Sequence, residues 1–218
     1  DVIPVIIPAK PLDRALQRLG GILDQSERRA LQAAMLSDVF AAATAFSSRV
    51  VVVTADELVA ALAREHGARV APDTDPPAGI NAAVARGIAV AGGPGALVVM
   101  GDLPHATAED LRQVTVAHHA GRGVVCALSR DGTGTNAMLL WPGDVIATRF
   151  GPDSLAHHVA AAEAADVEST LVTAPGLMLD VDTPDDLAAL LQRADASNAG
   201  RLCSALGVGD RLATAIDR

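Results

Sequence analysis

Asp102 stands where a carboxylate could act on a bound ligand. It follows one residue after residues 96–100, an apolar run that predicts a buried strand and leads into Gly101-Asp102-Leu103-Pro104. In open α/β sheets, ligands bind beyond the carboxyl ends of the strands, so a carboxylate at this point faces the binding crevice. An Asp that only bonds the backbone of a local turn gives the same pattern, and position alone does not separate the two interpretations.

Asp180-Val181-Asp182 adds two more carboxylates. In a strand, residues 180 and 182 share one face, and their charges repel unless they stay solvated, share a proton or hold a cation. Mg²⁺ prefers a few carboxylates together with water and phosphate oxygens. Alternatively, Asp182 caps the helix that starts at Thr183-Pro184, which leaves Asp180 unexplained. Taken with Asp102, the pair predicts a Mg²⁺ site.

Two further segments could bind an anion. Phe150-Gly151-Pro152-Asp153-Ser154 opens a predicted helix, where free N–H groups and the helix dipole favour a phosphate or carboxylate. Taken alone, this segment is better explained as an ordinary helix cap. Thr133-Gly134-Thr135-Asn136 could form a concave nest of N–H groups or, equally, a hairpin turn. Their occurrence together with three carboxylates slightly favours the nest and a metal–phosphate substrate.

The basic residues are 16 Arg and a single lysine, Lys10, in the loop after the first predicted strand. GC-rich codon usage explains most of this bias, but it singles out Lys10, whose loop also carries Arg14 and Arg18. No glycine-rich Walker A loop leads to Lys10, and no strong dinucleotide fingerprint is present. The adjacent pairs His118-His119 and His157-His158 cannot share one helix face, so we expect surface positions for them.

These residues require a framework that brings strand ends together, and the rest of the sequence predicts one. Strands and helices alternate almost throughout, which favours a single domain over residues 1–218, a three-layer α/β/α fold with a mostly parallel sheet. Asp24 with Glu27 predicts a capping box at the start of the first helix. From about residue 195 the chain looks loosely organised. We expect strands at 2–8, 49–54, 69–71, 96–100, 123–128, 136–141, 169–173 and 177–181, and helices at 24–46, 56–66, 81–91, 107–120, 154–165, from 183, and near 210–216.

Composition excludes several classes of protein. A net charge of −9 and only four aromatic residues, three Phe and one Trp, argue against nucleic-acid binding, which needs a basic surface and stacking platforms. No apolar run is long enough to span a membrane, and no signal peptide precedes the first strand. Cys126 and Cys203 make neither a disulfide framework nor a metal motif. We therefore expect a cytoplasmic protein. Its oligomeric state stays open, with a homodimer among the options.

An ordered series of motifs gives a resemblance. The segments begin at Pro8, Gly79, Gly101, Gly132, Phe150 and Asp180, and read PAKPL, GINAA, GDLP, GTGTN, FGPDS and DVDTP. Each is weak alone, but the ordered set resembles the 2-phospho-L-lactate guanylyltransferase family, whose actinobacterial members use phosphoenolpyruvate in biosynthesis of the deazaflavin coenzyme F-420. The resemblance covers the chain to about residue 194.

The resemblance implies a Rossmann-like nucleotidyltransferase fold of the GT-A kind that transfers GMP from GTP to a small phosphorylated acid and releases pyrophosphate. The implied site residues fall into four groups. Mg²⁺ ligands would be Asp102, Asp180 and Asp182; acceptor contacts Thr135, Gly151 and Ser154; the guanine nucleotide would lie near Asp56, Asn81 and Gly101; and Lys10 and Arg18 would face the triphosphate.

One departure and several alternatives remain. The family's first loop usually has a second lysine where this chain has Leu16, which could weaken turnover or alter the acceptor unless Arg14 supplies the charge. Alternatives are a related transferase acting on 3-phospho-D-glycerate, molybdopterin or a sugar phosphate, a glycosyltransferase, and a catalytically impaired nucleotide-binding homologue. The sequence does not separate phosphoenolpyruvate from 2-phospho-L-lactate.

Overall fold

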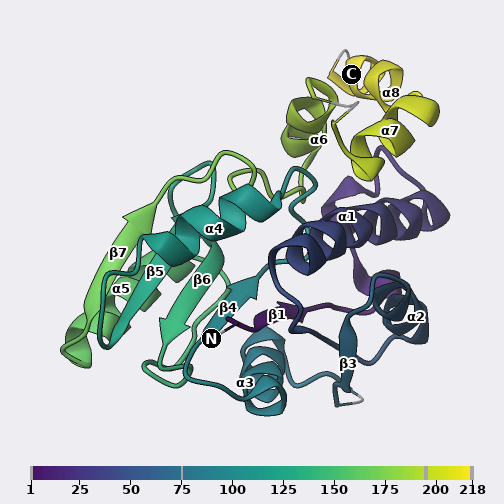
Figure 1. Cartoon of the computed structure of the whole chain (residues 1–218). Helices are drawn as coiled ribbons and strands as arrows, with labels where there is room; N and C mark the ends of the chain where they lie inside the picture. Colours follow the sequence, from purple (N-terminus) through teal and green to yellow (C-terminus); the bar gives the residue numbers. More distant parts are fainter. Residues whose placement is uncertain (1, 75, 194–195, 217–218) are drawn as a thin grey trace.

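A computed structural model describes residues 2–74, 76–193 and 196–216. Its seven strands form one sheet in the order β3-β2-β1-β4-β6-β5-β7 (Figure 1). Only β6 runs against its neighbours, β4 and β5, so the expected mostly parallel sheet is confirmed. The strands are β1 (Val5–Pro8), β2 (Val50–Thr54), β3 (Arg69–Pro72), β4 (Ala96–Val99), β5 (Gly123–Leu128), β6 (Thr135–Trp141) and β7 (Glu168–Val172).

Helices cover both faces of this sheet, which confirms the three-layer architecture. One face packs on α1 (Gln25–Phe46), α2 (Glu57–Glu65) and α4 (Ala108–Val116). The other packs on α3 (Ile80–Ala91) and α5 (Ser154–Ala164). Strands such as β2, with the sequence VVVVT, are buried along their whole length because helices lie on both sides. The predicted capping box of Asp24 and Glu27 starts α1.

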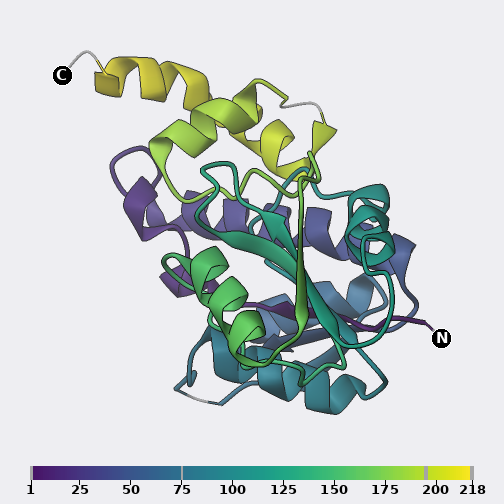
Figure 2. The same cartoon turned by 90° about the vertical axis from the view of Figure 1, so that its left-hand side faces the viewer.

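The C-terminal part of the chain differs from the loose organisation that the sequence predicted. Three helices, α6 (Pro184–Leu191), α7 (Asn198–Ala205) and α8 (Val208–Ile216), gather beside α1 (Figures 1 and 2). Apolar residues at helical spacing, among them Leu187, Ala199 and Leu212, are buried in one cluster. The cluster includes Leu16 and Leu19 of the first loop, so these helices support the loop that carries Lys10 and Arg18.

The expected strand at 177–181 does not form. Instead, this segment crosses the carboxyl end of the sheet and makes single backbone bonds, from Val181 N to Asp102 O (3.1 Å) and from Arg130 N to Met178 O (2.8 Å). The buried Asp110 carboxylate accepts from the Gly176 N–H (2.9 Å) and holds the turn that directs the chain across the sheet. Helix α4 was expected over residues 107–120 but ends at Val116. The chain then turns toward Gly121, which has a φ of 75°.

None of the described helices combines the length and apolar character that a membrane span requires.

Candidate active site

A pocket of about 470 Å³ opens at the carboxyl ends of the parallel strands. The loops after β1, β3 and β4, the start of α3 and one side of α1 form its walls, as expected for a switch region of an open α/β sheet. The lining residues are Pro8, Ala9, Lys10, Pro11, Arg14, Ala15, Leu16, Gln17, Arg18, Gln32, Leu36, Asp73, Pro77, Gly79, Ile80, Ala83, Met100, Gly101, Asp102 and Asp182.

Asp102 lies in this pocket with an unsatisfied carboxylate. The residue is half-buried as a whole, but its Oδ1 is fully buried and has no hydrogen-bond partner among the described residues. Burial raises the pKa of Asp102 to about 7; the charge of Asp180 adds to this change, and Lys10 opposes it. Such an atom is costly unless it finds a donor or a cation. The arrangement therefore fits a ligand or metal ion that is positively charged.

Gly101 lets the chain turn into the pocket beside α1. A Cβ built at this position would lie 2.7 Å from Leu36 Cδ2, and the Gly101 carbonyl accepts from Gln32 Nε2 (3.1 Å). A larger residue after β4 would therefore have to displace Leu36 of α1, next to Asp102.

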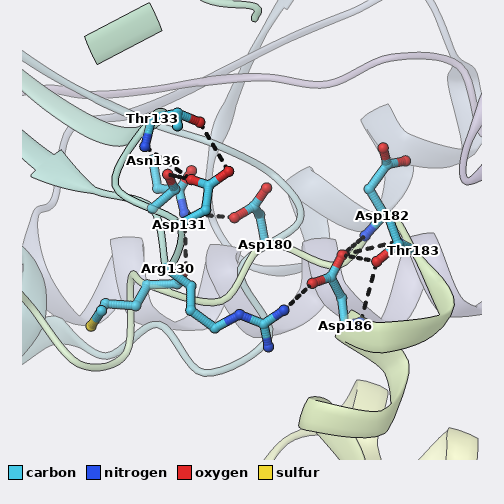
Figure 3. A network of polar contacts seen from close by, with 10 residues as sticks. Arg130, Asp131, Thr133, Asn136, Asp180, Asp182, Thr183 and Asp186 are labelled. Atoms are coloured by element: carbon cyan, nitrogen blue, oxygen red, sulfur yellow. Dashed lines mark hydrogen bonds and ion pairs between the residues drawn. The ribbon is translucent and has the colours of Figure 1, made fainter. Parts of the chain in front are cut away.

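Asp180 and Asp182 lie on the segment that crosses the sheet (Figure 3). Asp182 Oδ2 pairs with Arg18 Nη1 at 2.9 Å, and both side chains are largely exposed. Asp180 Oδ1 accepts from the buried Asn136 Nδ2 at 3.0 Å. In the part of the chain that the structure describes, no three Asp, Glu, His or Cys side chains are placed to share one ion. For Asp102, Asp180 and Asp182 to bind one metal ion, Asp182 would have to break its ion pair with Arg18.

Asp182 is not the cap of α6. Thr183 occupies that position, with its hydroxyl accepting from Asp186 N and the Asp186 carboxylate accepting from Thr183 N. Asp186 also pairs with Arg130 at 2.7 Å, as Figure 3 shows. Since capping is supplied by its neighbours, the Asp182 side chain is left for another role.

Three cationic side chains, Lys10, Arg14 and Arg18, reach the pocket from the loop after β1, and all are exposed. Between them, Leu16 adopts the left-handed conformation at φ 52° and is buried. It packs with the C-terminal helices as well as lining the pocket. A hydrophobic residue at position 16 therefore anchors the loop, while Arg14 supplies a cation close by.

The two predicted anion loops are bonded within the protein. Residues 129–135 form the β5–β6 hairpin, in which Thr133 N donates to Asp131 Oδ1 (3.0 Å) and Gly134 N to Ser129 Oγ (2.7 Å). The hairpin alternative is therefore correct and the nest is not formed. Thr135 N donates to Ser154 Oγ (2.9 Å), and both residues are buried. Gly151, at φ 134°, is exposed on the loop before α5.

Asp56 and Asn81 have structural partners. Asp56 Oδ1 caps α2, and its Oδ2 accepts from Leu12 N (2.9 Å), which ties the first loop to α2. Asn81 Nδ2 donates to the Phe150 carbonyl (3.1 Å) and its Oδ1 accepts from Phe150 N (2.8 Å). Neither residue lines the pocket, although Gly79 and Ile80, next to Asn81, do.

We expected surface positions for both His157 and His158, and this was wrong for His158. It is fully buried, whereas His157 is exposed. His158 Nε2 accepts from Arg149 N (2.9 Å), Nδ1 lies 3.1 Å from Thr135 Oγ1, and its ring packs edge-on against Phe150. Burial lowers the pKa of His158 to about 4, and the neighbouring His157 adds to this effect. The neutral ring thus holds the loop before α5 against β6.

Sequence reasoning also missed Asp73, which lines the pocket directly after β3. The sequence contained a signal for this residue, namely a carboxylate just after a predicted strand, as for Asp102. Asp131 was likewise overlooked; hydrogen bonds from Ser129 and Thr133 lower the pKa of its carboxyl to about 2 and stabilise the hairpin turn.

Carboxylates and cations thus surround a pocket at the carboxyl ends of a mostly parallel sheet, an arrangement typical of the nucleotidyltransferase class of α/β enzymes. Solved structures support the fold. A nucleotide-diphospho-sugar transferase from Desulfovibrio desulfuricans G20 has a TM-score of 0.73 at 16% identity, covering 95% of each chain. A nucleotidyl transferase from Methanothermobacter has a TM-score of 0.59 at 16% identity, covering 88% of this chain and 97% of that one.

A third similar structure is that of a metal-bound enzyme. Glucosyl-3-phosphoglycerate synthase from Mycobacterium tuberculosis, in complex with Mn²⁺, UDP-glucose and phosphoglyceric acid, has a TM-score of 0.54 at 13% identity and covers 78% of this chain and 69% of its own.

The chain belongs to the guanylyl transferase CofC-like family, which matches residues 3–209, and it is a nucleotidyltransferase. Two curated relatives are named phosphoenolpyruvate guanylyltransferase. The protein from Roseiflexus sp. is 40% identical, covering 92% of this chain and 90% of its own length. The protein from Conexibacter woesei is 42% identical, covering 85% of each. The family expected from the ordered motifs is confirmed.

Proposed function

We propose that this guanylyltransferase transfers GMP from GTP to phosphoenolpyruvate and releases pyrophosphate, as a cytoplasmic step in biosynthesis of coenzyme F-420. The observation that carries this proposal is the pocket, whose lining combines three cationic side chains with Asp102, a carboxylate whose buried Oδ1 has no partner among the described residues. Cations suit a triphosphate, and the names of the similar proteins support phosphoenolpyruvate as the acceptor.

In the proposed reaction, a phosphate oxygen of the acceptor attacks the α-phosphorus of GTP. A new P–O bond forms, the bond from the α-phosphorus to the bridging oxygen breaks, and pyrophosphate leaves. A phosphate monoester is already largely deprotonated at neutral pH, so no strong general base is needed. Lys10, Arg18 and Arg14 would orient the triphosphate and neutralise charge that develops on the leaving group.

Asp102, with Asp180 and Asp182, would hold a divalent cation, which we propose is Mg²⁺. The donor set fits, because Asp102 Oδ1 lacks a partner in the described part of the chain and two further carboxylates lie near enough to raise its pKa. Bound there, the cation would supply charge neutralisation and a template for the phosphates. Arg18, released from Asp182, would then be available to the nucleotide.

The acceptor would contact Thr135, Gly151 and Ser154. Support comes from their position, since Thr135 follows the hairpin and Ser154 starts α5, where the helix dipole favours an anion. The Thr135–Ser154 bond would open when a carboxylate or phosphate replaces it. Gly101 would adjoin the nucleotide directly, whereas Asp56 and Asn81 would support the nucleotide site through the loops they hold.

The test is pyrophosphate release from GTP with Mg²⁺, comparing phosphoenolpyruvate, 2-phospho-L-lactate and 3-phospho-D-glycerate. We expect release with phosphoenolpyruvate. Preference for another acceptor would revise the substrate, and GTP binding without release with all three would indicate an impaired homologue. The variant Asp182→Asn supplies the metal control: near-full Mg²⁺-dependent turnover in that variant would contradict the metal assignment.

A further inference from the structure

Asp73 reaches the pocket from the side opposite Asp102. Its N–H donates to the Thr54 carbonyl (3.0 Å), which fixes the residue at the end of β2 and β3. In the sheet order, β3 lies three strands from β4. With neighbouring strands about 4.8 Å apart, the two carboxylates follow strands separated by roughly 14 Å. The pocket is therefore elongated, with Asp102 and Asp182 toward one end and Asp73 toward the other.

The two ends differ in charge. Lys10 and Arg18 come from the loop after β1, and Arg18 pairs with Asp182 on the Asp102 side. Across the described residues, Asp73 forms no ion pair, and its Oδ1 accepts from Thr74 N at 2.8 Å. An ionised carboxylate accepts hydrogen bonds and repels phosphate. The Asp73 end thus suits a part of the ligand that carries hydrogen-bond donors.

The wall beside Asp73 is apolar. Pro77, in the loop that begins at Asp73, lines the pocket together with Ile80 and Ala83 of α3, a helix that contacts β3. Such a surface suits a flat ring, and ligand sites commonly combine apolar walls with a few polar groups that set specificity. A planar heterocycle with donors on one edge fits both features.

We propose that Asp73 selects the guanine base, a proposal that rests on the nucleotidyl transfer proposed above. Guanine carries two adjacent donors, N1–H and the N2 amino group, on its Watson–Crick edge. A carboxylate can accept both in a bidentate geometry. Adenine has an acceptor at N1 and no amino group at C2, so the same carboxylate disfavours it. Asp56 does not compete for this role, because both of its oxygens accept from backbone N–H groups.

The experiment compares wild type with Asp73→Asn in binding and in pyrophosphate release, using GTP, ITP, XTP and 2′-deoxy-GTP. ITP lacks the N2 amino group, and XTP has a carbonyl in its place. Wild type should prefer GTP over ITP by roughly 10- to 100-fold, the effect of one hydrogen bond to a charged group. In Asp73→Asn, GTP should weaken by a similar factor and XTP should gain, because the amide N–H₂ can donate to the xanthine carbonyl.

Glu57→Gln is the matched control, since it removes one carboxylate charge on the exposed start of α2, outside the pocket. It should keep the GTP:ITP ratio of wild type. An unchanged GTP:ITP ratio in Asp73→Asn would overturn the proposal. So would a change confined to the GTP:2′-deoxy-GTP ratio, which would assign Asp73 to the ribose. Failure of the proposed function can be distinguished from failure of this proposal. In that case wild type would release no pyrophosphate, while the ratio of GTP to ITP affinity in wild type and Asp73→Asn would still decide the role of Asp73.

Discussion

The Asn81 side chain bonds both backbone groups of Phe150, at 3.1 Å to the carbonyl and 2.8 Å from the N–H. The pairing joins the start of α3, beside the pocket, to the loop that precedes α5. One amide side chain thus links the two regions that the proposed reaction must bring together.

Asn81→Ala should weaken this link. Two hydrogen bonds are lost and two partly buried backbone groups are left unpaired, so we expect the free energy of unfolding to fall by about 1–3 kcal/mol. The KM for the acceptor should rise more than that for GTP, because the loop with Gly151 loses its support. Urea denaturation and steady-state kinetics measure both effects. Asn81→Asp, which can accept from Phe150 N but cannot donate, should be as defective; wild-type behaviour of both variants would contradict the link.

Arg18→Ala should reduce catalysis with little cost in stability. Its ion pair with Asp182 is exposed, so the free energy of unfolding should change by less than about 1 kcal/mol. Loss of a cation at the triphosphate should lower kcat/KM for GTP at least about tenfold. Arg29→Ala, which removes an exposed arginine paired with Asp13 outside the pocket, serves as the control. Equal kcat/KM values for the two variants would argue against a role for Arg18 at the phosphates.

Asp102→Asn should increase the stability of the protein but abolish its activity. The ionised carboxylate has a buried oxygen with no partner among the residues that the structure describes, so its replacement by a neutral amide should stabilise the metal-free protein by on the order of 1 kcal/mol. Mg²⁺-dependent pyrophosphate release should be lost at the same time. Thermal denaturation in EDTA and the pyrophosphate assay test the two halves. A destabilised variant that keeps its turnover would refute the assignment.

His158 predicts a loss of stability in mild acid. Its pKa falls from 6.5 to about 4 in the folded protein, so the unfolded chain binds the extra proton first as pH decreases. Its contribution is therefore intact above about pH 6.5 and declines toward pH 4, by about 3 kcal/mol at most. His158→Gln should flatten the pH dependence of the unfolding free energy over this interval. An exposed histidine elsewhere in the chain is the control, and His119→Gln should retain the wild-type slope.

Gly176→Ala should disturb the segment that carries Asp180 and Asp182. An added Cβ would overlap the Asp110 carboxylate and the His105 carbonyl, which cannot both move aside. We expect destabilisation of about 2 kcal/mol or more together with loss of turnover. Gly21→Ala is a clean control, since a Cβ there meets nothing within 4 Å. Equal stabilities of the two variants would show that the crossing segment can shift freely.

Much of the fold could be predicted, because apolar runs such as residues 50–53 alternate with capped amphipathic helices. The crossing segment could not: Leu177, Leu179 and Val181 alternate with other residues as in a strand, but their course is set by Asp110 and Asn136, far away in sequence. The local pattern of apolar residues does not indicate hydrogen-bond partners that are distant in sequence.

The site was predictable as far as strand ends mark ligand positions, which located Asp102 and the loop with Lys10. The roles of Asn81 and Asp56 were hidden, because a polar side chain that binds backbone and one that binds a ligand look alike in sequence. His158 was misplaced because adjacent histidines suggest a solvated face, whereas a turn of helix can bury one and expose the next.

The packing of Leu16 on the C-terminal helices has a consequence for synthesis of the chain. The loop that carries Lys10 and Arg18 leaves the ribosome well before its apolar partners, such as Leu187 and Leu212, are translated. During translation, Leu16 and Leu19 therefore have no complete surface to pack on. The loop that we propose binds the triphosphate can therefore be fixed in place only after α6, α7 and α8 have been made, and a chain truncated before α6 would leave this loop without its apolar support.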